Sequence, residues 1–419
     1  MKHTTQTHAV LLTAIGAWLN TFDASAQDMA PPIEPPPPVE APFPIQPAAP
    51  VEPPPPVDIP PAVEAQTPVE TAPESEPASE GPKLKAAVGV GLRAELQMDP
   101  DRPEPEDSPV YSVAHNLRPY FSGEAFDFIK FEGNLDVVGS NIQLLDAVLK
   151  LEFSEYFNLW IGRFLPPSDR ANLSGPYFQN AWTYPGGVNA YPSTYAGRDE
   201  GLAIWGHLFQ GHFKWQAGAF GMEGGTAEPR LAGRIVVNIL DPEPGYYNSS
   251  TYYGSKDVLA IGGAIQHSFA PEGAADEAAD TNWNLDALYE GNFAGAGTLD
   301  IEGAFYGFGG SDAGNSFFGL ASFMFEPILG VGRLQPMFRA QLASWDDGES
   351  FSVFGTDYTP PPNGDASLLT LDFGLNYIID GHNARLSATL THTRFDADVE
   401  GFDGQTDTIF ILGGQVQAF

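Results

Sequence analysis

Between residues 83 and 419, apolar side chains recur at every second position in segments of about ten residues. In the first segment Val88, Val90 and Leu92 alternate with glycines and with Arg93. Alternation with a period of two is typical of a β-strand that has one apolar and one polar face. The pattern therefore predicts an all-β region, and it continues in segments 129–137, 145–152, 212–219 and 282–290.

The length of these segments distinguishes between two kinds of β protein. Strands of soluble sandwiches are usually about five or six residues long, and their apolar face packs against a second sheet. A strand that crosses a membrane needs about 9 to 11 residues, and closing the sheet into a barrel pairs its backbone groups. The segments therefore predict an antiparallel transmembrane β-barrel over residues 83–419, surrounded by outer-membrane lipid.

The segments number about sixteen, and an even number is usual in bacterial barrels. If both ends of this region lie on the inner side of the membrane, long external loops should alternate with short internal turns. The order of the connections largely follows this scheme. Residues 240–257 are the exception, because a long connection falls where a short turn is expected.

The third external connection, residues 166–198, is the longest and is rich in aromatic residues and glycine. Long loops without secondary structure are usually functional or disordered. Its aromatic side chains favour packing against an inner wall, which predicts a loop folded into the lumen as a constriction. A loop that stays on the outer surface is the alternative interpretation.

The tryptophans provide a further indication of a membrane. They fall near the expected strand ends or on the apolar face, where aromatic rings form a girdle at the level of the lipid headgroups. Packing in a soluble core is the alternative. The residues concerned are Trp160, Trp205, Trp215, Trp283 and Trp345.

The first 82 residues differ in composition from the barrel region. A lysine, a short apolar stretch from Ala9 to Leu19 and the small residues Ala24 and Ala26 predict a signal peptide over residues 1–26. Residues 27–82 are rich in Pro and Glu, cannot bury a core, and are predicted to be a disordered periplasmic linker. The linker would be either an inert tail or a spacer that reaches the cell wall or a periplasmic partner.

The composition also excludes several kinds of chemistry. A formal charge of -35 argues against nucleic acid as a partner, because few bases are available to neutralise phosphates. The chain has no cysteine, and its eight histidines lack metal-ligand spacing. Neither a phosphate-binding loop nor a serine-hydrolase motif is present. We therefore expect no cofactor, no bound metal and no enzymatic activity.

Three segments carry a likeness to a known family: HNLRPYFSGEAFDFIKFEGNLDV (115–137), LLDAVLKLEFSEYFNLWIGRFLPP (144–167) and YYNSSTYYGSKDVLAIGGAIQH (246–267). On these segments the chain resembles the phosphate-selective porin O and P family. The resemblance covers residues 85–419 and implies a porin of sixteen strands, usually a homotrimer. It also implies a third loop that folds inward and basic residues in the lumen that pass anions.

This chain departs from the family in the charge of its lumen, because acids are interleaved with bases on the polar strand faces. A lumen of mixed charge predicts weak net selectivity. A local anion site is still compatible with the sequence, either at Arg230 and Arg234 or at Arg170 and Arg198. The residues predicted to line the pore or its constriction are Arg93, Glu95, Arg118, Lys130, Glu132, Lys150, Asp169, Arg170, Arg198, Asp199, Glu200, Lys214, Arg230, Arg234 and Arg339.

Three functions are compatible with such a barrel. The first is an outer-membrane porin through which small hydrophilic solutes and ions diffuse passively, phosphate or other anions among them. The second is a structural barrel that tethers the envelope through its Pro-rich segment. The third is a barrel hydrolase, which would need two lumen acids at catalytic distance. The sequence favours the diffusion channel.

Overall fold

The computed structural model describes residues 85–100, 109–186, 191–226, 228–269, 279–309, 314–327, 330–345, 351–353, 356–358, 366–397 and 404–418. The predicted signal peptide and the Pro-rich linker with its tethering role lie outside the described residues. Within those residues, no helix is long and apolar enough to cross a membrane.

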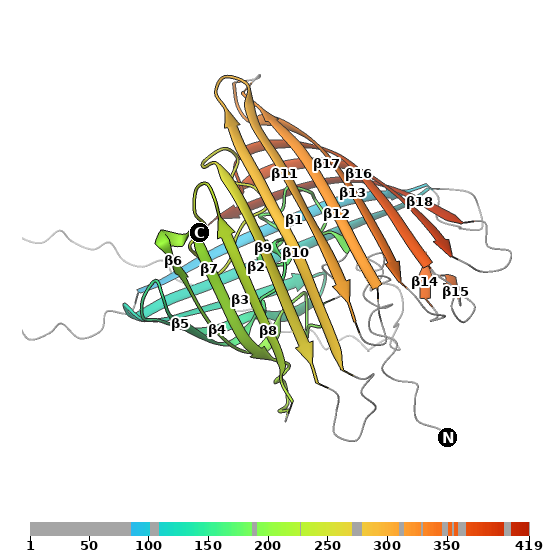
Figure 1. The fold of residues 1–419 in the computed structure, drawn as a ribbon. Coiled ribbons are helices and arrows are strands. Elements are labelled where there is room, and N and C mark those ends of the chain that lie inside the picture. The colour runs from blue at the N-terminus through green and yellow to red at the C-terminus, as the bar shows by residue number, and fades with distance from the viewer. Residues whose placement is uncertain are drawn as a thin grey trace, which may run out of the picture. The chain divides into compact units, whose positions relative to one another are not determined.

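Sixteen strands of the described chain form one closed antiparallel barrel (Figure 1). The first strand, β1 (Lys85–Asp99), pairs with the last, β18 (Gln405–Ala418), to close the sheet. The prediction of an all-β antiparallel barrel of about sixteen strands is therefore confirmed. Between them lie β2 (Val110–Phe126), β3 (Ile129–Val138), β4 (Asn141–Glu152), β5 (Asn158–Phe164), β6 (Asp199–Leu208), β7 (Phe213–Phe220), β8 (Arg230–Asn238), β9 (Val258–Ser268), β10 (Asp280–Phe293), β11 (Gly297–Phe308), β12 (Gly314–Phe325), β13 (Arg333–Trp345), β16 (Ala366–Asp380) and β17 (Ala384–Ala397).

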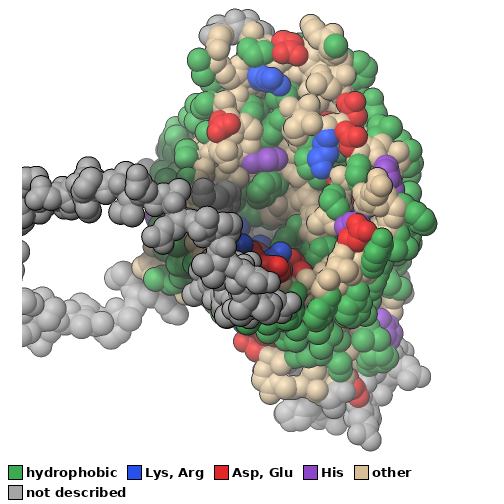
Figure 2. All heavy atoms as spheres, turned by 90° about the vertical axis from the view of Figure 1, so that its left-hand side faces the viewer, with side chains coloured by type: hydrophobic (Ala, Val, Ile, Leu, Met, Phe, Trp, Pro, Cys, Tyr) green, Lys and Arg blue, Asp and Glu red, His purple; other side chains and the backbone are tan. Residues whose placement is uncertain are grey.

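The strands alternate as the sequence predicts, with apolar side chains outside and polar side chains inside. On β10, Leu285 is 60% exposed on the outer face, whereas Asn284 and Asp286 beside it are buried in the lumen. Exposed Val, Leu, Ile and Phe side chains occur on strands all around the barrel. Figure 2 shows hydrophobic side chains gathered along the outer side of the face in view. Lipid solvates such a surface, and closure pairs both edges of each strand. The barrel therefore spans a membrane.

Most connections at one end of the barrel are short, including 127–128, 294–296 and 381–383. Another is the one-turn helix η2 (Phe209–Gly211) between β6 and β7. At the opposite end most connections are longer, apart from the two-residue turn 139–140 between β3 and β4. The connection between β13 and β16 contains a hairpin of β14 (Phe351–Val353) and β15 (Thr356–Tyr358).

Two long connections lie inside the barrel. Loop 3 (165–198) joins β5 to β6 at the long-loop end, and turn 4 (239–257) joins β8 to β9 at the short-turn end. Tyr177 and Trp182 of loop 3 are buried, as are Tyr246 and Thr251 of turn 4. The prediction that the third loop folds inward is confirmed. Turn 4, which did not fit the alternating scheme, enters the same lumen from the other end.

Candidate pore constriction

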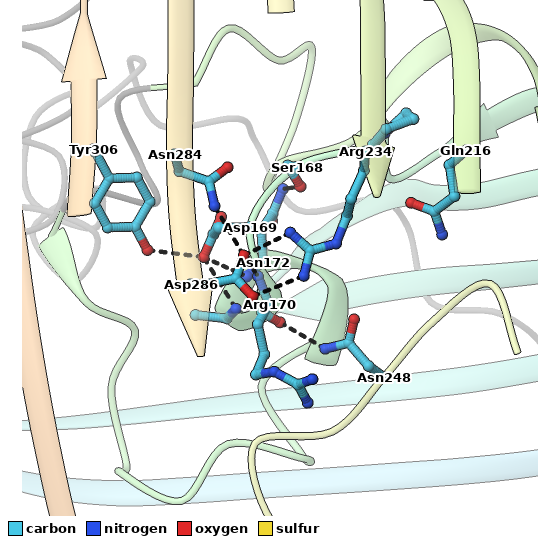
Figure 3. A network of polar contacts seen from close by, with 12 residues as sticks. Ser168, Asp169, Arg170, Asn172, Gln216, Arg234, Asn248, Asn284, Asp286 and Tyr306 are labelled. Atoms are coloured by element: carbon cyan, nitrogen blue, oxygen red, sulfur yellow. Dashed lines mark hydrogen bonds and ion pairs between the residues drawn. The ribbon is translucent and has the colours of Figure 1, made fainter. Parts of the chain in front are cut away.

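Loop 3 begins with one helical turn, α2 (Arg170–Ser174), that is fixed to the barrel wall (Figure 3). The side chain of Asp169 caps this turn, because it accepts hydrogen bonds from the backbone N–H groups of Ala171 at 3.0 Å and Asn172 at 3.3 Å. The hydroxyl of Tyr306 on β11 donates to the same carboxylate at 2.8 Å. Burial, and the nearby carboxylate of Asp286, raise the pKa of Asp169 to about 6. The start of loop 3 is thus held by a buried carboxylate.

A second carboxylate, that of Asp286 on the wall strand β10, also holds this turn. It accepts two hydrogen bonds from the guanidinium of Arg234 on β8, at 2.5 and 2.8 Å, and one from the backbone N–H of Arg170 at 3.3 Å. The amide of Asn284 donates to it as well, at 2.8 Å. Figure 3 shows these groups converging on the helical turn. Arg234 is therefore used to position loop 3.

Farther along, loop 3 crosses to the opposite wall, where side chains from four strands donate hydrogen bonds to its backbone carbonyls. Arg385 on β17 donates to the carbonyl of Gln179 at 2.6 Å, Arg93 on β1 to that of Trp182 at 2.6 Å, and Arg339 on β13 to that of Thr183 at 2.7 Å. The fourth strand, β16, contributes an asparagine rather than an arginine to this set: Asn376 donates to the carbonyl of Asn180 at 3.0 Å. Strand bases that would otherwise face water thus secure the loop.

Glycines in the wall allow loop 3 to approach closely. A Cβ atom on Gly91 of β1 would lie 2.7 Å from the ring of Tyr177, and one on Gly413 of β18 would overlap the ring of Trp182. Because strands gain little from glycine, its use here is explained by the rings that pack against the backbone. The ring of Trp182 also lies under the guanidinium of Arg93, 4.1 Å from its carbon.

Turn 4 and loop 3 are joined by a buried ion pair. Both terminal nitrogens of Arg170 donate to the carboxylate of Glu243, at 2.8 and 2.6 Å, and both side chains are only 1% exposed. Burial alone would raise the pKa of Glu243, but the charge and hydrogen bonds of Arg170 lower it to about 2. The carboxylate is therefore ionised at neutral pH, and the two loops form one unit in the lumen.

Neutral hydrogen bonds extend this contact. The backbone N–H of Ser250 donates to the carbonyl of Phe178 at 3.1 Å, and the hydroxyl of Tyr246 donates to the carbonyl of Leu165 at 3.0 Å. The hydroxyls of Ser174 and Ser250 lie 3.3 Å apart. Turn 4 thus contacts loop 3 along much of its first half.

Turn 4 is itself bound to the wall. The backbone N–H groups of Tyr252 and Gly254 donate to Glu290 on β10, at 2.5 and 2.6 Å. Lys214 on β7 donates to the carbonyl of Gly245 at 2.9 Å. At the far side, the ring of Tyr253 lies 4.8 Å from that of His382, in the turn between β16 and β17. The segment therefore crosses the lumen.

An aromatic cluster packs under turn 4. Trp160 stacks on Tyr246 with ring centroids 4.6 Å apart, and Trp205 and Phe164 contact Tyr246 edge-on. The prediction of a lipid-facing girdle is therefore wrong for Trp160 and Trp205, which are buried on the lumen side. Three apolar residues in succession, 159–161, gave no alternation from which to assign the face. Trp283 does lie outside, at 40% exposure.

A cavity of about 430 Å³ remains between the two loops and the wall formed by β2, β3 and β4. Figure 2 views the molecule from the left-hand side of Figure 1. It shows a hollow on this side of the barrel, with Lys, Arg, Asp and Glu side chains at its base. The cavity is lined by Arg118, Tyr120, Glu132, Asn134, Asp146, Leu165, Leu173, Ser174, Gly175, Pro176, Tyr177, Phe178, Arg198, Tyr247, Asn248, Ser249, Tyr252 and His382.

The charged side chains of this lining are paired with opposite charges. Arg118 donates to Asp136 at 2.9 Å, and Arg198 donates to Asp146 at 3.2 Å. Glu132 accepts from Lys150. Burial, helped by the charge of Arg385, lowers the pKa of His382 to about 4, so its ring is neutral at pH 7. The cavity is therefore close to neutral overall, and aromatic and aliphatic side chains make up much of its lining.

The structure places the predicted site residues in three groups. Arg118, Glu132 and Arg198 line the cavity. A second group positions the loops and comprises Arg93, Glu95, Asp169, Arg170, Lys214, Arg234 and Arg339. The third group forms wall contacts: Lys130 with Glu152 at 2.7 Å, Asp199 with Arg230, Glu200 with Arg163, and Lys150 over the ring of Trp160 at 4.1 Å.

Sequence reasoning missed Glu243, Tyr247 and Tyr252, which all belong to turn 4. The unexpected length of this connection was the signal that could have found them. No group of three or more His, Asp or Glu residues in the described parts of the chain is arranged to hold a metal ion.

A closed barrel with an even number of strands, an apolar outer belt and a polar lumen is the architecture of bacterial outer-membrane proteins. The protein is accordingly a transmembrane β-barrel of the bacterial outer membrane, with two loops folded into its lumen.

Comparisons with known proteins agree on this fold. No protein-family model and no curated protein matches the sequence. The high-pH structure of Pseudomonas putida OprB is 10% identical over 80% of this chain and 94% of its own, with a TM-score of 0.53. Salmonella typhi OmpF in complex with daunomycin is 12% identical over 81% and 98%, with a TM-score of 0.51. At such low identity the likeness shows a shared fold.

Proposed function

We propose that this protein is a passive diffusion channel of the outer membrane, without enzymatic activity, and that solutes pass between loop 3, turn 4 and the wall of β2, β3 and β4. The observation that carries the proposal is the cavity of about 430 Å³ that lies inside the barrel between the two loops and the wall. A hydrated space inside a barrel that lipid surrounds is the element that a channel requires.

The charges support weak selectivity. Resemblance to phosphate-selective porins favours an anion preference, which Arg118 and Arg198 at the cavity would supply. Each of the two pairs with a carboxylate, however, and Arg170 and Arg234 are bound to Glu243 and Asp286. We therefore propose a channel that passes small ions and polar solutes of either sign, with phosphate as one anion among others. A homotrimer, which the resemblance implies, is part of the same proposal.

Reconstitution into a planar bilayer tests the proposal. The purified protein should give discrete conductance steps, and its reversal potential in a potassium chloride gradient should be small. Added phosphate should compete only weakly with the chloride current. A folded barrel, identified by its heat-modifiable mobility in gels, that never conducts would refute the channel. A hydrolytic activity lost on substitution of a lumen acid would instead favour an enzyme.

A further inference from the structure

We infer that turn 4, and not loop 3 alone, sets the bore of the passage and with it the largest solute that passes. This inference rests on the proposed channel and names the element that determines its size limit. Its support comes from three features of turn 4: its place in the cavity wall, the bonds that hold it, and the way it leaves the hairpin of β8 and β9.

Turn 4 forms one part of the cavity wall. Loop 3, the strands β2, β3 and β4, and His382 supply the rest of the lining. Without turn 4, the cavity would open toward the short-turn end, from which this segment enters the lumen. The residues of turn 4 in the lining are Tyr247, Asn248, Ser249 and Tyr252.

Turn 4 is held from two strands that are not neighbours in the sheet. On β7, Lys214 donates to the carbonyl of Gly245 at 2.9 Å, and Gln216 donates to the carbonyl of Tyr246 at 2.6 Å. On β10, Glu290 accepts two backbone N–H groups of the same segment. A segment fixed in this way keeps its position when a solute passes, so the gap beside it has a constant width.

The position of loop 3 also depends on turn 4. Besides its ion pair with Glu243, Arg170 donates to the carbonyl of Ser249 at 2.7 Å, and its own carbonyl accepts from the amide of Asn248 at 3.1 Å. Loss of turn 4 would leave the Arg170 side chain, which is 1% exposed, as a buried charge without a partner, and this is strongly unfavourable. The start of loop 3 would then rearrange, so the passage would widen on two sides.

Turn 4 can be removed without breaking the sheet. The ladder between β8 and β9 continues past the strand ends, because the backbone N–H of Ile239 donates to the carbonyl of Leu259 at 2.7 Å and that of Asp241 to the carbonyl of Asp257 at 2.9 Å. Residues 242–256 thus begin and end at paired positions. Asn-Gly is a favoured two-residue turn between paired strands, so it can close this hairpin in their place.

Replacing residues 242–256 by Asn-Gly in the full-length protein tests the inference. Single-channel conductance in potassium chloride should rise by about twofold or more, because ion flow depends on the width of the pore. In swelling assays, liposomes that carry the variant should admit larger polyethylene glycols than liposomes that carry the wild type. The matched control replaces residues 222–228, between β7 and β8, by Asn-Gly. No described residue of that connection lines the cavity, so the control should conduct like the wild type.

A point variant tests the same inference if the shortened protein fails to fold, which the absence of heat-modifiable mobility would reveal. Tyr247→Ala removes one ring of turn 4 from the cavity lining and should also admit larger polyethylene glycols than the wild type. The matched Tyr247→Phe variant keeps the ring and should keep the wild-type size limit. An unchanged size limit in folded Tyr247→Ala would contradict the inference.

The outcomes separate the role of turn 4 from the channel itself. Wild-type conductance and size limit in the folded, shortened protein would overturn the inference and leave the channel standing. A silent wild type beside a conducting shortened variant would refute the proposed channel but support turn 4 as the element that narrows the lumen. Silence of both folded proteins would overturn both.

Discussion

At the scale of single residues, the buried ion pair between Arg170 and Glu243 joins loop 3 to turn 4 inside the lumen. Breaking a buried pair leaves one charge without a partner, at a cost of about 3–5 kcal/mol. We therefore expect Glu243→Gln to lower the free energy of unfolding by about that amount. The protein is titrated with urea, and the folded fraction is measured as the intensity of its heat-modifiable band in gels. The control is Glu228→Gln, at an exposed loop residue. A loss no larger than that of the control would contradict the buried pair.

The pH dependence of stability should show two opposite contributions. Asp169 has a folded-state pKa raised from 3.8 to about 6, so between these values the folded protein binds more protons than the unfolded chain, and stability falls as pH rises. Glu243 has a lowered pKa, so its contribution is present above pH 4.5 and is lost as pH falls toward 2.

The Asp169→Asn variant isolates the first contribution. An asparagine still caps the helical turn but does not titrate. We expect its unfolding midpoint in urea to change less between pH 4 and 6 than that of the wild type. An identical pH profile for both proteins would show that Asp169 does not titrate in this range.

At the scale of elements, loop 3 and turn 4 come from opposite ends of the barrel and meet inside it. The hydroxyls of Ser174 and Ser250 lie 3.3 Å apart, so cysteines at these two positions would bring their sulfur atoms close together, and the chain has no native cysteine to compete. The double variant Ser174→Cys, Ser250→Cys should form a disulfide on mild oxidation, seen as a thiol-sensitive shift in gel mobility. The two single variants serve as controls. Free thiols in the folded, oxidised double variant would show that the loops lie apart.

The strands could be predicted from the sequence, because in each of them apolar side chains that face lipid alternate with polar side chains that face the lumen. Loop 3 was also predictable, since its length and aromatic residues are local features. The path of turn 4 was not, because Arg170 and Glu243 are 73 positions apart and nothing near either residue indicates the other. Trp160 was misassigned because both of its neighbours are apolar as well.

At the scale of the whole molecule, selectivity depends on how the paired charges of the lumen balance. Replacing Arg198 leaves Asp146 at the cavity without its partner. We expect Arg198→Gln to raise the cation-to-anion permeability ratio by up to about fivefold, which corresponds to about 1 kcal/mol for one charge near water. Arg394→Gln makes the same charge change at an exposed position outside the cavity and is the control. Equal reversal potentials for the two variants would exclude Arg198 from the passage.

The route of the solute is the central claim, and modification of single introduced cysteines tests it most directly. Tyr247 lines the cavity, whereas Thr391 of β17 faces the lumen but lies outside that lining. A charged methanethiosulfonate reagent added during bilayer recording should reduce the conductance of Tyr247→Cys in discrete steps and leave that of Thr391→Cys unchanged. Block of Thr391→Cys alone, or of neither variant while current flows, would contradict a passage between the two loops and the wall of β2, β3 and β4.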